Sequence, residues 1–259
     1  MDAPTLDVAI AYLHPGQVSA AFSLSLLKLM LHETYRTGVP PFVIANRCGA
    51  GNLVEGRNQA VSHMLDSTTC NWLLFTDSDM GFGADAVERL LEVADPVARP
   101  VVGGLCFALR RVGTDQETQA EEFRCEPTVY HWRELEDRDG FEVVEDYERD
   151  AVVQVGATGA AFLLMHRSVL ERIRARYGDR WFDRVPHTKR NDAGAVVFSA
   201  LFSEDISFCI RVAGVDRPLF VHTGVRTCHD KGGRFYDEAE WDRQLLLAGP
   251  RPAEALASA

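Results

Sequence analysis

The sequence predicts an α/β fold built on a largely parallel sheet. Over the first 107 residues, short apolar runs alternate with helix-length segments, and turn residues lie between them. The apolar residues of the longer segments recur at helical spacing. Strands that alternate with helices in this way form βαβ units with right-handed crossovers. A hydrophobic content of 46% and a charged content of 25% are typical of a globular protein.

The first part of the chain is expected to hold four strands and three helices. The predicted strands span residues 6–13, 41–46, 72–76 and 100–107. The predicted helices span residues 18–36, 53–65 and 84–93, and the last of these ends before Pro96.

The second part of the chain is less regular. A hairpin is expected over residues 127–132 and 141–145, a broken strand over 152–165, a strand over 218–222, and helices over 168–177, 203–213 and 237–247. Residues 110–126 and 183–199 are predicted to be loops, and the second is long enough to be a lid or binding loop. We expect one domain over residues 1–249 and a disordered tail over residues 250–259.

Charge and composition argue against several classes of protein. The net charge of −11 disfavours broad binding of nucleic acid through a basic face. The six cysteines show no C-x-x-C spacing, so free thiols in a reducing compartment are expected. The longest apolar stretch, residues 157–165, is too short to cross a bilayer, and the N-terminus lacks the pattern of a signal peptide. A cytoplasmic protein without a transmembrane segment is the expectation.

Two aspartates close the third predicted strand. Asp77 and Asp79 are separated by one residue, and in an extended segment such residues point to the same side. Their oxygens are the ligands that Mg²⁺ and Mn²⁺ prefer. A solvated turn explains the pair as readily when it is taken alone.

Three motifs later in the chain offer further groups that could bind a ligand together with this pair. Small residues surround Gly159, which would let a ligand or a packed backbone approach closely. Glu204 and Asp205 open a predicted helix, where acids also favour the helix dipole. Residues 222–233 carry two histidines, Lys231 and two glycines, which suit a cation and a diphosphate.

The order of these motifs resembles GT-A-fold glycosyltransferases, in particular the family 2 group, over roughly residues 6–235. Their "G-G-x-x-L-L-x-R", "G-x-F-D" and "E-D-x-D-L-x-x-R" patterns are matched by residues 159–167, 181–183 and 204–211. Ser207 stands where an acid is frequent, and the first strand departs from the usual wording of the family. Residues 54–58 resemble phage-encoded members of this fold.

The resemblance implies a GT-A (Rossmann-like) mixed sheet flanked by helices. Residues 1–107 would form the nucleotide-sugar-binding half, and residues 108–249 the acceptor and catalytic half. The implied activity is the transfer of a sugar from a nucleoside-diphosphate sugar, with UDP-sugars as the expected donors, to an acceptor hydroxyl. Mn²⁺ or Mg²⁺ is the implied cofactor.

The resemblance also implies roles for individual residues in binding the donor. The implied metal ligands are Asp77, Asp79 and His229, with His222 as the second candidate for the histidine. Asp77 would alternatively contact the ribose. The residues implied in donor binding are Arg57, Asp77, Gly159 and Lys231, with the two cationic side chains on uracil or phosphate groups.

Two acids carry the implied catalytic step. In an inverting enzyme, Asp205 would take the proton from the acceptor hydroxyl, and Glu204 would orient the acceptor. In a retaining enzyme, Asp205 would bind the acceptor or the sugar instead. The acceptor is open among a glycan, a metabolite and a hydroxylated pyrimidine in phage DNA. A nucleotidyltransferase of related fold and a noncatalytic sugar-nucleotide-binding protein are the alternative functions.

Overall fold

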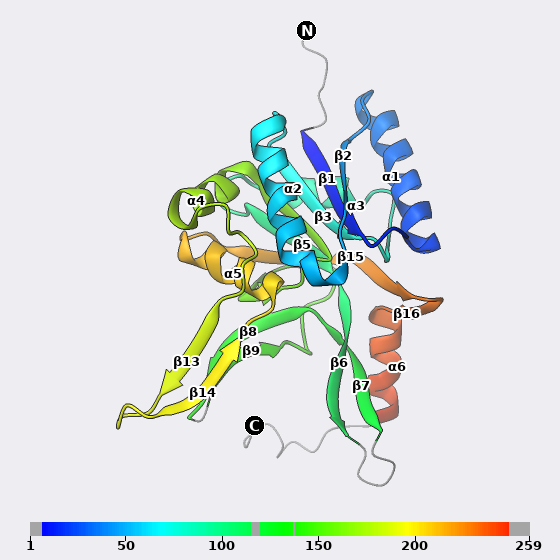
Figure 1. Cartoon of the computed structure of the whole chain (residues 1–259). Coiled ribbons are helices and arrows are strands. Elements are labelled where there is room, and N and C mark those ends of the chain that lie inside the picture. Colours follow the sequence, from blue (N-terminus) through cyan, green and yellow to red (C-terminus); the bar gives the residue numbers. More distant parts are fainter. Residues whose placement is uncertain (1–6, 115–119, 137, 249–259) are drawn as a thin grey trace.

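The computed structural model describes residues 7–114, 120–136 and 138–248, and these form a mixed sheet with helices on both faces (Figure 1). The strands of the main sheet lie side by side in the order β10 (Val152–Val155), β15 (Leu219–Lys231), β5 (Val101–Leu105), β12 (Phe162–His166), β3 (Trp72–Asp77), β1 (Val8–His14) and β2 (Phe42–Arg47). Strand β12 runs antiparallel to both of its neighbours, and β10 runs antiparallel to β15. The remaining pairs along this path are parallel. The expected α/β class is therefore confirmed, with a mixed sheet.

The direction of chain travel reverses at β1. Helix α1 (Ala20–Thr37) connects β1 to β2 on one side of β1. The short helix η1 (Ala50–Asn52) and α2 (Leu53–Ser67) then connect β2 to β3, which pairs with the other side of β1. In α/β sheets, ligands bind at the carboxyl ends of the strands where the order reverses in this way. The carboxyl ends of β1 and β3 are therefore where a ligand is expected.

The helices form one layer on each face of the sheet. Helices α1 and α3 (Ala86–Val93) share one apolar core, and α2, α4 (Arg167–Tyr177) and α5 (Glu204–Gly214) share the other. Opposite faces for α1 and α2 follow from right-handed crossovers that leave β1 in opposite directions. The βαβ half that was expected from periodicity is thus confirmed. None of the helices in the described parts of the chain is long and apolar enough to cross a bilayer.

Both segments that were predicted to be loops form β-hairpins instead. In place of the loop over 110–126 there are β6 (Phe107–Thr114) and β7 (Glu121–Pro127), and in place of the loop over 183–199 there are β13 (Pro186–Arg190) and β14 (Val196–Leu201). Figure 1 shows both hairpins projecting from the sheet. Most of their side chains are exposed, so their polar composition reflected exposure and not irregular structure.

The predicted hairpin is confirmed as β8 (Val129–Glu134) and β9 (Asp139–Val143), and the broken strand as β10, β11 (Ala157–Thr158) and β12. The strand predicted over 218–222 is much longer than expected. Strand β15 bulges between His222 and Arg226 and then pairs with two short strands that were not predicted, β4 (Met80–Phe82) and β16 (Arg234–Tyr236). The last helix, α6 (Glu238–Ala248), packs on β7. The predicted tail lies outside the described residues.

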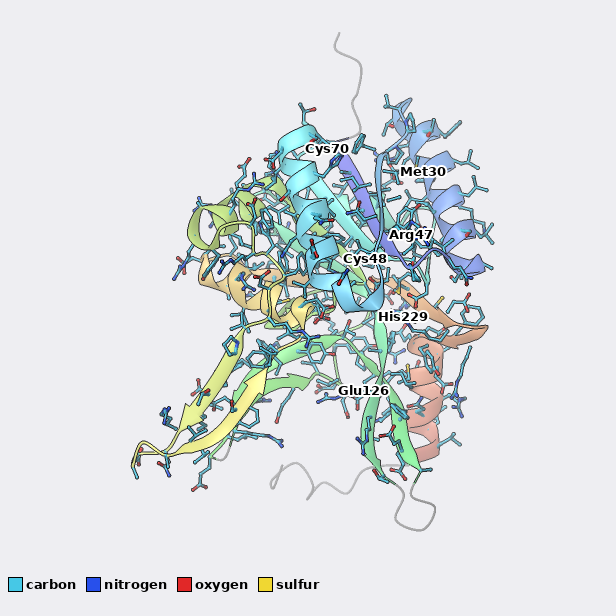
Figure 2. The ribbon with its side chains drawn as sticks, viewed as in Figure 1. Met30, Arg47, Cys48, Cys70, Glu126 and His229 are labelled. Carbon is cyan, nitrogen blue, oxygen red and sulfur yellow. The ribbon has the colours of Figure 1, made fainter. Side chains whose placement is uncertain are left out.

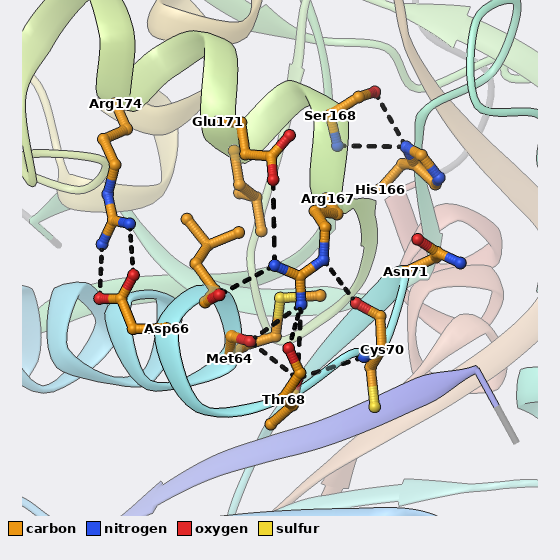
Figure 3. Close-up of polar contacts among 12 residues, drawn as sticks. Met64, Asp66, Thr68, Cys70, Asn71, His166, Arg167, Ser168, Glu171 and Arg174 are labelled. Atoms are coloured by element: carbon orange, nitrogen blue, oxygen red, sulfur yellow. Dashed lines mark hydrogen bonds and ion pairs between the residues drawn. The ribbon is translucent and has the colours of Figure 1, made fainter. Parts of the chain in front are cut away.

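Arg167, the first residue of α4, joins this helix to the end of α2. Its guanidinium donates hydrogen bonds of 2.8–3.1 Å to the backbone carbonyls of Met64, Leu65, Thr68 and Cys70 (Figure 3). The last carbonyls of a helix lack partners within the helix, and a cation is favoured there. Arg167, the last residue of the glycine-rich motif, therefore caps the C-terminal end of α2.

We expect Arg167→Ala to lower the free energy of unfolding by about 2–3 kcal/mol, because four partly buried carbonyls lose a charged donor. For a chain of this size the midpoint of thermal unfolding should fall by about 5–10 °C. Arg174→Ala is the matched control, because its ion pairs are with the exposed Asp66 and Asp179, and it should cost less than about 1 kcal/mol. Equal losses in the two variants would contradict the capping role.

Candidate metal centre and its surroundings

Two aspartates and a histidine meet at the carboxyl end of β3. Asp77 is the last residue of β3, Asp79 precedes β4, and His229 lies on β15 opposite Met80. One ligand atom from each lies within 4.8 Å of the other two. The pairing of β4 with β15 brings the histidine there, and the Asp230 N–H donates to the Asp79 carbonyl at 2.7 Å. The three side chains offer two carboxylates and one imidazole to a cation.

The imidazole of His229 is held in one orientation. Its Nδ1 lies 2.5 Å from the carbonyl oxygen of Phe107, and a carbonyl can only accept a hydrogen bond. Nδ1 therefore carries a proton, and in the neutral ring Nε2 is the nitrogen with a free electron pair. Nε2 faces Asp77, 3.9 Å from Oδ2. Metal-binding histidines are commonly oriented by such a backbone carbonyl.

Asp77 is held in its ionised form. Burial raises the pKa of this carboxyl, but contact with His229 and the positive charge of Arg57 outweigh the burial and bring the pKa to about 2. The side chain is therefore a carboxylate at neutral pH. This is the form that coordinates a cation.

A cavity of about 390 Å³ lies beside Asp79. Its walls come from the loop after β1, from Ser78 and Asp79, and from the turn between β15 and β16. Gly232 and Gly233 both have positive φ, 68° and 88°, a conformation that glycine adopts at little cost. The N-terminus of α1 opens onto the same cavity, and Lys231 forms an ion pair with Asp79. A helix N-terminus and an ammonium group favour an anion at this position.

Arg57 connects the metal centre with the acids of α5. Its guanidinium is 3.2 Å from Asp77 Oδ1 and 3.1 Å from Glu204 Oε1. Only 3% of Arg57 is exposed, so its guanidinium is buried between the two carboxylates. The resemblance implied a contact with uracil or phosphate; in the structure this side chain holds two carboxylates in place.

Glu204 and Asp205 form the first turn of α5. Asp205 Oδ1 accepts hydrogen bonds from the Ser203 hydroxyl and, at 2.8 Å, from the Ile206 N–H. Helix α5 is held by Arg211, which donates to the carbonyl of Asp183 at 2.5 Å. Arg211, the last residue of the E-D-x-D-L-x-x-R-like motif, therefore fixes α5 to the segment around Asp183.

Asn58 was not predicted as a site residue. Its amide nitrogen donates to Asp183 Oδ1 at 2.8 Å, and its amide oxygen accepts from the Phe182 N–H at 2.9 Å. It thereby ties α2 to the segment that Arg211 also holds. The available signal was its position beside Arg57 near the start of the predicted helix.

Two other candidates lie apart from the cluster. His222 is on the first part of β15, paired with Gly104 and Val152, and its Nδ1 accepts from the Gly224 N–H at 3.2 Å. Gly159 is buried against Thr128, whose side chain would be 3.4–3.5 Å from an added Cβ. The structure therefore groups His229, and not His222, with the two aspartates.

Comparison with solved structures finds proteins of similar fold. Among them, the crystal structure of A197 from STIV aligns with 90% of this chain and 91% of its own, at a TM-score of 0.46 and 15% sequence identity. No protein-family model matches the chain. No curated protein sequence matches it. The case for a function therefore comes from the site's own geometry.

Proposed function

We propose that this protein is a metal-dependent glycosyltransferase, which moves a sugar from a nucleoside-diphosphate sugar to an acceptor hydroxyl. The observation that carries the proposal is the cluster of Asp77, Asp79 and His229 at the reversal point of the sheet, beside a cavity suited to an anion. A buried arginine connects this cluster with Glu204 at the start of α5. One side of the site thus suits a cation and a diphosphate, and the other offers a proton acceptor.

The ligand set fits Mn²⁺ or Mg²⁺. Two carboxylates and one imidazole are hard or intermediate donors, and such sites leave coordination positions for phosphate oxygens. When bound, the cation would act as a Lewis acid that stabilises the charge on the leaving nucleoside diphosphate. Lys231 and the N-terminus of α1 would add positive potential on the same side of the diphosphate.

The transfer itself needs one bond made, one broken and one proton moved. In an inverting reaction the acceptor oxygen bonds to the anomeric carbon as the bond from that carbon to the diphosphate oxygen breaks, and its electron pair leaves with the diphosphate. Asp205 takes the acceptor's proton. Because Oδ1 already accepts two hydrogen bonds, the proton would go to Oδ2. Glu204 would orient the acceptor while Arg57 holds its carboxylate.

A donor screen tests the function. The protein is incubated with UDP-glucose, UDP-galactose, UDP-N-acetylglucosamine and other nucleoside-diphosphate sugars in Mn²⁺ or Mg²⁺, and nucleotide release is measured with and without EDTA. Release of nucleoside diphosphate that depends on the metal is the expected result. Release of pyrophosphate from a nucleoside triphosphate would instead support a nucleotidyltransferase. Binding of nucleotide without turnover would support a binding protein, and absence of binding would contradict all three.

We expect His229→Gln to weaken Mn²⁺ binding by about 10–100-fold or more. Loss of a residue that only orients a metal ligand already weakens metal binding by about 10–100-fold, and His229 would be a ligand itself. The affinity is measured by calorimetry or by electron paramagnetic resonance in the presence of UDP. His222→Gln is the matched control on the same strand and should leave the affinity unchanged. An unchanged affinity in His229→Gln would remove this histidine from the metal site.

A further inference from the structure

A second cavity, of about 470 Å³, lies among the projecting hairpins. Its lining comes from β6 and β7, from both strands and the turn of the β8–β9 hairpin, from β14, and from Phe202 just before α5. The donor cavity beside Asp79 shares none of these lining residues. Phe202 stands two residues before Glu204 in the chain, so one wall of the cavity leads directly to the proposed catalytic acids.

Aromatic side chains form one wall of this cavity. The centroid of the Phe202 ring is 5.8 Å from that of Phe141 and 6.2 Å from that of Trp132. His187 on β13 lies 5.8 Å from Phe202, and Phe198 on β14 lines the cavity beside them. Of these rings, those of Phe141, Phe198 and Phe202 line the cavity, and Trp132 and His187 pack against them. The three lining rings offer apolar surface to a ligand.

The two hairpins that carry these rings are fixed to each other. Asp139 on β9 forms an ion pair with Lys189 at 2.7 Å and a hydrogen bond with His187 Nε2 at 3.3 Å. Lys189 also donates to the carbonyl of Leu135. The wall is therefore preformed, which lowers the entropic cost of binding a ligand.

The lining also includes a buried carboxylate with one oxygen that has no hydrogen-bond partner among the described residues. Glu126 is only 8% exposed, and its Oε2 has no hydrogen-bond partner among the described residues. The nearest cation is Arg110, whose Nη1 lies 3.5 Å from this oxygen. In Figure 2, Glu126 lies below His229, among the hairpins. A buried acceptor of this kind is costly unless a donor reaches it. A ligand hydroxyl in the cavity would supply that donor.

The chain itself joins the cavity to the proposed base. Phe202 lines the cavity, and Asp205 follows three residues later in the first turn of α5. Three residues span at most about 11 Å when fully extended, so the wall of the cavity and the proposed base are neighbours.

The charges around the cavity nearly cancel. The charged residues that line it are three arginines and four acids, Arg110, Arg133, Arg138, Glu126, Asp139, Glu142 and Glu145. A groove that follows a phosphate backbone needs an excess of positive charge. A neutral ligand with many hydroxyls suits this lining better, since carboxylates and guanidinium groups bond to its hydroxyls and the rings cover its C–H faces.

We propose that this cavity is the acceptor subsite and that it takes a neutral saccharide. The acceptor role rests on the proposed transferase function, whereas the binding of the saccharide does not. The aromatic wall would stack on the sugar ring, and Glu126 with Arg110 would bond to hydroxyls on its other side. The hydroxyl to be glycosylated would then point toward Asp205.

Binding of saccharides to three variants tests the subsite. The probes are methyl glycosides of glucose, galactose, mannose and N-acetylglucosamine, with cellobiose and maltose, and binding is followed by saturation-transfer NMR with Mg²⁺ and UDP present or absent. At least one probe should bind, and its affinity should fall ten-fold or more in Glu126→Gln and in Phe198→Ala. Glu121→Gln is the matched control, because its ion pair with Arg111 lies on the same hairpin outside the cavity, and its affinity should stay within two-fold. Thermal unfolding of each variant reports on its folding.

The outcomes separate this inference from the proposed function. Failure of every probe to bind, or equal affinity in all variants, overturns the subsite. Binding of a 12-nucleotide single-stranded DNA with the same dependence on Glu126 also overturns it. UDP binding and metal-dependent turnover report on the transferase function, and they should be unchanged in Glu121→Gln. Saccharide binding without UDP binding would remove the transferase function and leave the cavity as a saccharide site.

Discussion

Replacing Asp79 with alanine should abolish metal-dependent turnover and leave the fold intact. Asp79 supplies one of the two carboxylates of the candidate metal cluster, and it forms an ion pair with Lys231. In the proposed reaction, its loss would remove a ligand of the cation, and the leaving diphosphate would lose electrostatic stabilisation. A fall of at least about a thousand-fold in turnover is expected, which corresponds to roughly 4 kcal/mol of transition-state stabilisation. The fold should survive, because removal of Asp79 also relieves repulsion from Asp77.

The measurement is nucleotide release over a range of Mn²⁺ concentrations, together with thermal unfolding. Asp85→Ala is the matched control, since Asp85 is an exposed aspartate that follows β4 closely and lies outside the cluster. It should keep its activity. Turnover in Asp79→Ala within ten-fold of the parent protein, in a folded sample, would refute the metal site.

Replacing Asp205 with asparagine should remove transfer and spare donor binding. The amide keeps the Oδ1 acceptor that the Ile206 N–H uses, so the first turn of α5 should stay in place. It has no basic oxygen to take the acceptor's proton. Loss of a general base typically costs about 10²–10⁴-fold in rate. The dissociation constant of UDP should change by less than two-fold, because Arg57 joins the metal cluster to Glu204 and not to Asp205.

Calorimetry with UDP and Mn²⁺ measures binding, and transfer to an acceptor found in the saccharide screen measures catalysis. Asp192→Asn is the control, because this exposed residue lies in the connection between β13 and β14. It should behave like the parent protein. Transfer that persists in Asp205→Asn would show that Asp205 is not the base, and would direct attention to a retaining reaction.

The first half of the fold was predictable because its signals are local. Apolar runs marked β1, β3 and β5, and the helical spacing around Phe22 and Leu29 marked α1, whose apolar face is buried as the pattern requires. The position of Asp77 at the end of a buried strand placed it at the edge of the sheet where a ligand is expected. These inferences need only neighbouring residues and the handedness of βαβ units.

Local signals did not predict the β6–β7 and β13–β14 hairpins, or the part of β15 that carries His229 to the two aspartates. Hairpin β13–β14 has both faces partly exposed, so it shows little of the alternation that marks a half-buried strand. The bulge after His222 carries β15 onward to β4, 140 or more residues away in the chain, and only that pairing brings His229 to Asp79. The choice between the two histidines therefore depends on strand register.

The sequence by itself determined the α/β class, the βαβ half, and the presence of acids at the end of β3 and the start of α5. Only the tertiary structure decided that His229 joins the two aspartates, that Arg57 bridges Asp77 to Glu204, and that the hairpins enclose a cavity around Glu126. The physical reason is the range of the forces involved. Periodicity and turn chemistry act over a few residues, whereas strand register, burial and ion pairing join segments that are far apart in the chain.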